Sequence, residues 1–175
     1  MLRNSPAGYG AVSKSLHGLI AVLIVAMLCV GFYMTQLPRE SSMRPLLFFL
    51  HKSTGVTVLL LVIVRVLWTL ANPMPPLNAH AIERFAARFV HLGLYLCMLA
   101  MPVSGYVMAT SGPRPFDYFG LFPLPRLAPD EALGDTATLV HTSLPWVLLA
   151  LLGLHLLGVL KHHLHDRDHP IKRMW

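Results

Sequence analysis

A stretch of 25 residues without Asp, Glu, Lys or Arg, residues 136–160, constrains this chain more than any other feature. It is long enough to cross a bilayer as an α-helix. The stretch contains His141 and His155, whose spacing of 14 residues is close to four whole helical turns. Both imidazoles therefore lie on one helix face, roughly 21 Å apart along the axis. Polar side chains at two depths in lipid are costly, so they are usually kept for a function.

The composition extends this reading to the whole chain of 175 residues. It is 55% hydrophobic with a mean hydropathy of +0.59, and only 13% of it is charged, against about 25% in soluble domains. We therefore expect one integral membrane domain over residues 1–175. The net charge of +6 does not indicate nucleic acid binding, because the basic residues form no cluster interleaved with aromatic ones. In a membrane protein they are better read as topology signals.

The hydropathy pattern predicts an all-α membrane protein, a bundle of four transmembrane helices. The expected spans are residues 15–37, 44–72, 89–110 and 137–161. Pro73 ends the second span, because proline cannot continue a helix. Pro102 and Pro145 are expected to kink the third and fourth spans. The longest connection, residues 111–136, holds five prolines and is expected to form an ordered cap over one face of the bundle.

The distribution of Lys and Arg predicts how the bundle is oriented. One side would carry eight: Arg3, Lys14, Arg84, Arg88, Lys161, Arg167, Lys172 and Arg173. The other side would carry five: Arg39, Arg44, Lys52, Arg114 and Arg126. Because basic residues are enriched on the cytoplasmic side, both termini are expected to be cytoplasmic.

With this orientation, the membrane histidines fall into two groups by depth. His51 and His141 lie near the outer face, and His155 lies near the cytoplasmic face with either His17 or His91. Two imidazoles can bind a haem iron from opposite sides, which gives a centre suited to electron transfer. The two groups therefore predict two haems, one near each face, with His17 and His91 as alternatives for one inner ligand.

Three residues near His51 in the sequence agree with haem binding. Gly55 is four residues further on, on the same helix face, where a missing side chain would let a porphyrin approach. Arg65 is fourteen residues after His51 and so lies at the depth of the inner haem, where a propionate would supply the anion that a buried arginine needs. Lys52 would add positive potential over the outer haem, or would only extend to the interface.

The tail of the fourth span adds a candidate for a quinone. His162 follows His155 by seven residues and lies on the same helix face at the membrane edge. It could hydrogen-bond a quinone carbonyl beside the inner haem. The alternative is that His162 and the nearby His163, His165 and His169 are solvated histidines at the membrane interface. A single membrane histidine can also serve only as an interhelical hydrogen-bonding group, but five at matched depths would leave too many polar groups unsatisfied in lipid.

Several segments together resemble the prokaryotic cytochrome b561 family of small di-haem membrane cytochromes. They are "SKSLHGLI" around His17, "LLFFLHKSTGVTVLLLVIVRVLW" at 46–68, "NPMPPL" after it, "VHLGLYLCMLAMPVSGYVM" at 90–108 and "VHTSLPWVLLALLGLHLLGVLKHH" at 140–163. The resemblance covers nearly the whole length. It implies two non-covalent haems b in a four-helix bundle of the bacterial inner membrane.

Carried onto this sequence, the family's ligand pairs are His51 with His141 and His17 with His155, so the resemblance favours His17 over His91. It implies an oxidoreductase with ubiquinone as electron acceptor. The chain is also similar to a superoxide oxidase of the family, so superoxide or another periplasmic donor is expected to supply the electrons.

Two other functions are compatible with the same residues. One is a cytochrome b anchor subunit that relays electrons between quinone and a dehydrogenase or hydrogenase. The other is a transporter in which the histidines bind Zn²⁺ or Cu²⁺, ions that imidazole suits. The absence of carboxylates within the spans makes the transporter the weaker of these. The sequence leaves open whether the chain is a monomer or a homodimer.

Overall fold

Four long helices and one short hairpin make up the computed structural model, which describes residues 1–6, 8–72, 75, 80–112 and 116–164. The helices are α1 (Ala11–Gln36), α2 (Met43–Ala71), α3 (Ala81–Thr110) and α4 (Glu131–Leu164). The strands β1 (Asp117–Tyr118) and β2 (Phe122–Pro123) lie between α3 and α4. All four helices are long and apolar enough to cross a membrane. The predicted fold class is therefore confirmed.

Three helices begin several residues earlier than the hydropathy pattern predicted, α1 at Ala11 rather than near residue 15 and the other two by a larger margin. Helix α3 starts at Ala81 rather than near residue 89, and α4 starts at Glu131 rather than near 137. A capping box begins α3, in which His80 and Glu83 satisfy each other's backbone N–H groups. Hydropathy detects only the part of a helix that lipid surrounds, so it does not detect the polar first turns of these helices.

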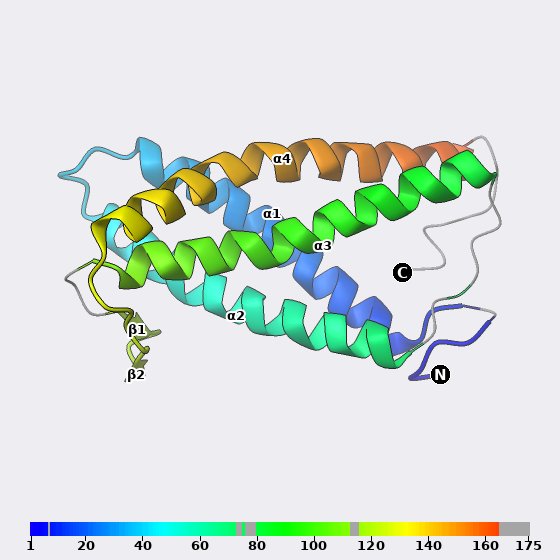
Figure 1. Ribbon diagram of the computed structural model, residues 1–175, viewed down its shortest axis with the longest axis horizontal. Coiled ribbons are helices and arrows are strands. Elements are labelled where there is room, and N and C mark those ends of the chain that lie inside the picture. Colours follow the sequence, from blue (N-terminus) through cyan, green and yellow to red (C-terminus); the bar gives the residue numbers. More distant parts are fainter. Residues whose placement is uncertain (7, 73–74, 76–79, 113–115, 165–175) are drawn as a thin grey trace.

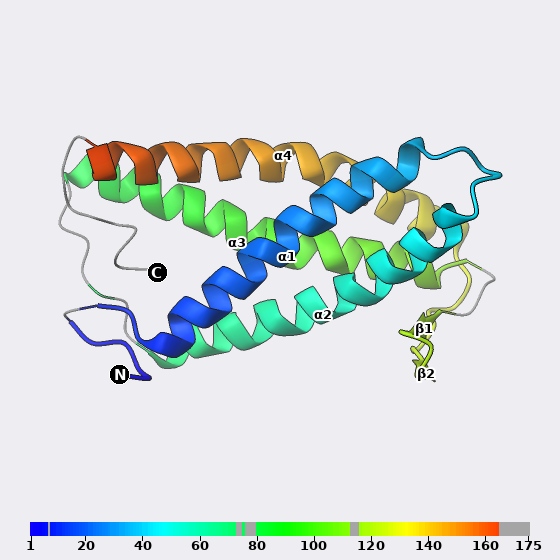
Figure 2. The same cartoon turned by 180° about the vertical axis from the view of Figure 1, so that it is seen from behind.

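The helices pack in sequence order. Helix α3 lies along α4, α1 packs on α2, and α2 also contacts α3. Figures 1 and 2 show α1 crossing the bundle at an angle, with the start of α1 and the end of α4 at one end of the molecule and the hairpin at the other. Figure 1 also shows a bend in α4 between its first turns and the rest. The predicted membrane orientation stays a prediction. Five residues that the sequence analysis used lie outside the described residues: Pro73, Arg114, Arg167, Lys172 and Arg173.

The interior of the bundle is small. Ile20 of α1 packs against Val58 and Val62 of α2, and partly buried side chains of α3 complete this cluster. Many large apolar side chains point outward instead, among them Leu60, Leu67, Leu96, Trp146 and Leu157. Such an outer surface is costly in water and is what a lipid environment favours.

The hairpin docks on α2 at the end of the bundle away from the N-terminus. Its two strands pair antiparallel, and Phe119 takes a positive φ of 48° in the turn between them. The backbone N–H of Phe119 donates to Ser53 Oγ at 3.0 Å. The Tyr118 hydroxyl lies 2.9 Å from Thr57 Oγ1, one helical turn further along α2. The described part of the predicted cap is thus tied to α2 directly after His51.

Candidate functional site

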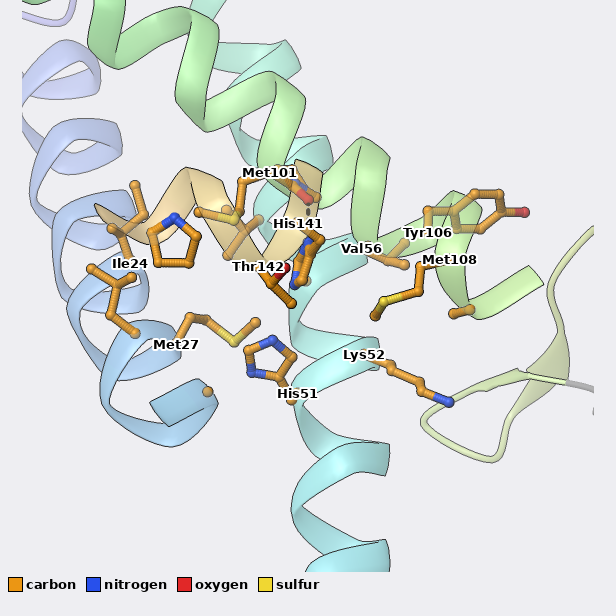
Figure 3. A pocket seen from close by; sticks show the side chains of 18 of the residues that line it. Ile24, Met27, His51, Lys52, Val56, Met101, Tyr106, Met108, His141 and Thr142 are labelled. Atoms are coloured by element: carbon orange, nitrogen blue, oxygen red, sulfur yellow. Dashed lines mark hydrogen bonds between the residues drawn. The ribbon is translucent and has the colours of Figure 1, made fainter. Parts of the chain in front are cut away.

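The structure brings His51 and His141 together at the hairpin end of the bundle. His51 projects from α2 and His141 from α4, and their ring centroids are 6.3 Å apart with the planes at 88°. Both rings line a cavity of about 260 Å³, and Figure 3 shows them among the other side chains that line it. Its lining is mostly apolar and includes Met27, Met98, Met101, Tyr106, Phe116 and Thr142. We call His51, His141 and this cavity the outer cluster, after the predicted membrane orientation, which stays a prediction.

Helix α3 holds the His141 ring in one orientation. Its Nδ1 lies 2.9 Å from the Met101 carbonyl oxygen and 3.3 Å from Ser104 Oγ. A carbonyl can only accept, so Nδ1 carries the proton and donates to Met101, and Nε2 keeps its lone pair for a metal. On the other side, His51 Nδ1 is buried and has no hydrogen-bond partner among the described residues. Such an unsatisfied polar atom indicates a group that the protein atoms do not supply.

Two glycines lie directly against these rings. A Cβ at Gly105 would be 2.7 Å from His141 Cε1, and a Cβ at Gly31 would be 3.2 Å from His51 Cε1. Any side chain there would push the imidazoles out of place. Gly55, the glycine that the sequence singled out, also lines the cavity, but a Cβ there would meet Met27 Cε at an ordinary 3.7 Å. The sequence reasoning missed Gly31 and Gly105, although both are glycines within apolar helices at the depth of the outer cluster.

Three histidines meet near the other end of the bundle. The ring centroid of His155 lies 6.4 Å from that of His17, with planes at 69°, and 5.4 Å from that of His91, with planes at 60°. These side chains come from α4, α1 and α3, and we call them the inner cluster. Both alternatives that the sequence left open are therefore in contact with His155.

Arg65 belongs to the inner cluster. Its positive charge acts on His17, His91 and His155. The Nε of Arg65 donates to the Tyr95 hydroxyl at 3.3 Å, while its Nη1 is buried and has no hydrogen-bond partner among the described residues. A guanidinium with a buried donor that has no partner among the described residues is well suited to bind an anion. Sequence reasoning missed Tyr95, whose position four residues after His91 was its only signal.

The two remaining predicted residues lie at opposite ends. Lys52 lines the outer cavity with its Nζ 5.6 Å from the centre of the Phe116 ring. His162 lies in the last turn of α4, half-buried, next to Lys161. Lys161 forms an ion pair with Glu83 of α3.

The geometry of the clusters fits a metal held between two imidazoles. Rings that bind one metal ion from opposite sides, with metal–nitrogen bonds of roughly 2 Å, have centroids roughly 6 Å apart. The His51–His141 and His17–His155 pairs have this separation. The buried donor of Arg65 that has no partner among the described residues fits an anionic group such as a haem propionate.

Four apolar helices that bring histidines together at two levels define the class of membrane-bound b-type cytochromes. The model of the prokaryotic cytochrome b561 family matches residues 8–175, so the chain belongs to this family. Cytochrome b561 homolog 2 of Escherichia coli (strain K12) is 36% identical over 174 residues, which cover 98% of this chain and 93% of that protein. The probable superoxide oxidase CybB of Yersinia pestis is 26% identical over 168 residues, covering 95% and 94%. Membership of the family implies haem b as a cofactor.

Proposed function

We propose that this chain carries electrons across the bacterial inner membrane through two haems b, from superoxide or another periplasmic donor to ubiquinone. The observation that carries the proposal is a histidine pair at each of two levels, with ring separations of 6.3 and 6.4 Å. A haem bound by two imidazoles supplies one-electron exchange between ferric and ferrous iron. Two such centres on one helix face are roughly 21 Å apart along its axis.

In this proposal, His51 and His141 are the outer ligands and His17 and His155 the inner ones. The spacing of His17 from His155 supports this choice, because it matches that of the outer pair. His91 is closer to His155, at 5.4 Å, which is short for a pair that holds a metal between its rings. His91 then has a second role at the inner haem, as a contact of quinone or of the haem edge.

The chain's other residues orient the ligands and keep water out. The Met101 carbonyl oxygen accepts a hydrogen bond from His141 Nδ1–H, which leaves Nε2 available to the metal. The apolar side chains of the outer cavity exclude water, which strengthens every charge interaction inside. Arg65 offers its unused donor to a haem propionate at the inner level.

The direction of electron flow rests on the predicted orientation. The hairpin end would face the periplasm and both termini the cytoplasm. Lys52 at the outer cavity would attract an anionic donor such as superoxide. The relative from Yersinia pestis is named a probable superoxide oxidase, which agrees with this donor. Ubiquinone would accept the electrons near His162, at the inner end of α4.

Arg65 also weighs against a metal transporter. A guanidinium whose charge acts on all three inner histidines would repel Zn²⁺ or Cu²⁺ from that cluster.

A cytochrome b anchor subunit would use the same centres. A partner protein that co-purifies with the chain in stoichiometric amount would identify it.

Reconstitution in vesicles tests the proposal. The haem-loaded protein is placed in vesicles that contain ubiquinone, and superoxide is generated outside. We expect quinol to form, and to stop forming when superoxide dismutase is added or when His51 is replaced by alanine. Quinol formation that is unchanged by dismutase would rule out superoxide as the donor, and no formation with any periplasmic-side reductant would contradict the electron path.

A further inference from the structure

Arg65, Thr69 and Tyr95 form a closed ring of hydrogen bonds at the inner cluster. Arg65 Nε lies 3.3 Å from the Tyr95 hydroxyl, which lies 3.5 Å from Thr69 Oγ1. Thr69 Oγ1 in turn lies 2.8 Å from the backbone carbonyl of Arg65. The ring starts at the side chain of Arg65 and ends at the backbone carbonyl of the same residue. Tyr95 and Thr69 therefore connect the Arg65 side chain back to its own helix.

The direction of every bond in this ring is determined. A guanidinium has no acceptor, so the Tyr95 oxygen accepts from Arg65 Nε. A carbonyl has no proton, so the Thr69 hydroxyl donates to the Arg65 carbonyl. The remaining contact can then only have Tyr95 as donor and Thr69 as acceptor. The Tyr95 hydroxyl therefore accepts one hydrogen bond and donates another. The Tyr95 ring also lies under the guanidinium, with Arg65 Cζ 5.8 Å from the ring centre.

The ring restricts a side chain that would otherwise be free to leave. An arginine near the end of a membrane helix normally extends its charged head toward the interface. Tyr95 projects from α3 while Arg65 and Thr69 belong to α2, so the ring also joins two helices. Arg65 is thereby held where its charge acts on the inner histidines, and its Nη1 has no hydrogen-bond partner in the part of the chain that the structure describes.

We infer that Tyr95, supported by Thr69, is a positioning residue that holds Arg65 at the inner haem and so raises the reduction potential of that haem. The inference rests on the proposed function, since it requires a haem between His155 and its partner. A fixed positive charge in a low-dielectric site stabilises the reduced form, which carries one more electron. A higher inner potential favours electron transfer from the outer level to the quinone side.

Midpoint potentials of the two haems in the purified, haem-loaded protein test the inference. Tyr95→Phe keeps the aromatic ring under the guanidinium and removes only the hydroxyl. We expect the equilibrium constant for reduction of the inner haem to fall about tenfold, which is about 59 mV for a one-electron couple. The potential of the outer haem should not change. Thr69→Val should shift the inner potential in the same direction by less, and Thr69→Ser should leave it at the wild-type value.

Tyr33→Phe is the matched control, because Tyr33 is an exposed tyrosine of α1 and should change neither potential. Unaltered low-spin spectra in the Tyr95 variant would show that the ligands are intact. An inner potential that Tyr95→Phe and Thr69→Val both leave unchanged would overturn the inference, as would equal shifts at both haems. A wild-type protein without two haems would instead overturn the proposed function. If Tyr95→Phe does not fold, the comparison of Thr69→Val with Thr69→Ser tests the inference by itself.

Discussion

Gly105 lies directly against the imidazole of His141. A Cβ at Gly105 would be 2.7 Å from Cε1 and 3.0 Å from Nδ1 of that ring, and the same Nδ1 donates to the carbonyl of Met101, one turn earlier on α3. Two successive turns of α3 therefore determine the position of a side chain of α4. The turn at Gly105 leaves room for the His141 ring, and the turn at Met101 orients it.

Replacing Gly105 by alanine should weaken the outer haem site. The added methyl group must displace the His141 ring, and overpacking of this kind costs about 1–3 kcal/mol. We expect the outer haem to bind roughly tenfold or more weakly, measured as haem per chain during titration of the haem-free protein. Gly158→Ala on α4 is the control, since no atom of the described residues outside its own helix lies within 4 Å of a Cβ there. Equal haem binding by both variants would contradict the close fit at Gly105.

Alanine substitutions should distinguish the two inner candidates. If His17 and His155 are the inner ligands, His17→Ala should lose one of two haems and keep the outer one. His91→Ala should keep both haems in the low-spin state. Haem per chain and the reduced absorption spectrum check this. The reverse pattern, with the haem lost from the His91 variant only, would assign the inner site to His91 and His155.

Lys52 should speed reduction of the outer haem by an anionic donor. Its charge lies at the outer cavity, and attraction between charges raises association rates. We expect Lys52→Gln to slow reduction by superoxide several-fold, and to weaken the dependence of the rate on salt. Lys52→Arg keeps the charge and should retain most of the rate. A rate constant that is the same for Lys52→Gln and wild type at low salt would show that this charge does not guide the donor.

Ser53 should be important for the stability of the hairpin end. The side chain is fully buried, and its Oγ accepts the N–H of Phe119, a residue held at positive φ. Ser53→Ala leaves that N–H without its acceptor, so we expect a loss of about 1–3 kcal/mol of unfolding free energy. Ser42→Ala should change stability by less than about 0.5 kcal/mol, because Ser42 is exposed and forms no capping bond. Thermal unfolding of the two variants in detergent checks this.

The sequence predicted the helices and which histidines meet at the same level of the bundle, because both depend on position along one axis. Uncharged runs identify a span, and counting residues from its end gives the depth. Depth does not tell which way a side chain points around the bundle. Side chains from both α1 and α3 reach His155 of α4, as His17 and His91 show, so spacing along the chain alone could not separate the two candidates.

The close contacts between helices could not be predicted from the sequence. Gly31 and Gly105 matter because of rings that belong to other helices, and Gly55 was singled out only because it shares a helix face with His51. Tyr95 matters because α2 places Arg65 and Thr69 beside it. Such pairs are separated by tens of residues in the chain, and no periodicity within one helix indicates them.

A redox titration of the purified wild-type protein, with haem quantified per chain, tests the central claim most directly. The account predicts two low-spin b haems per chain with separate one-electron midpoints, and the loss of one of them in His51→Ala. A single haem per chain would remove one level of the electron path. A protein that binds no haem when haem supply is adequate would contradict the account altogether.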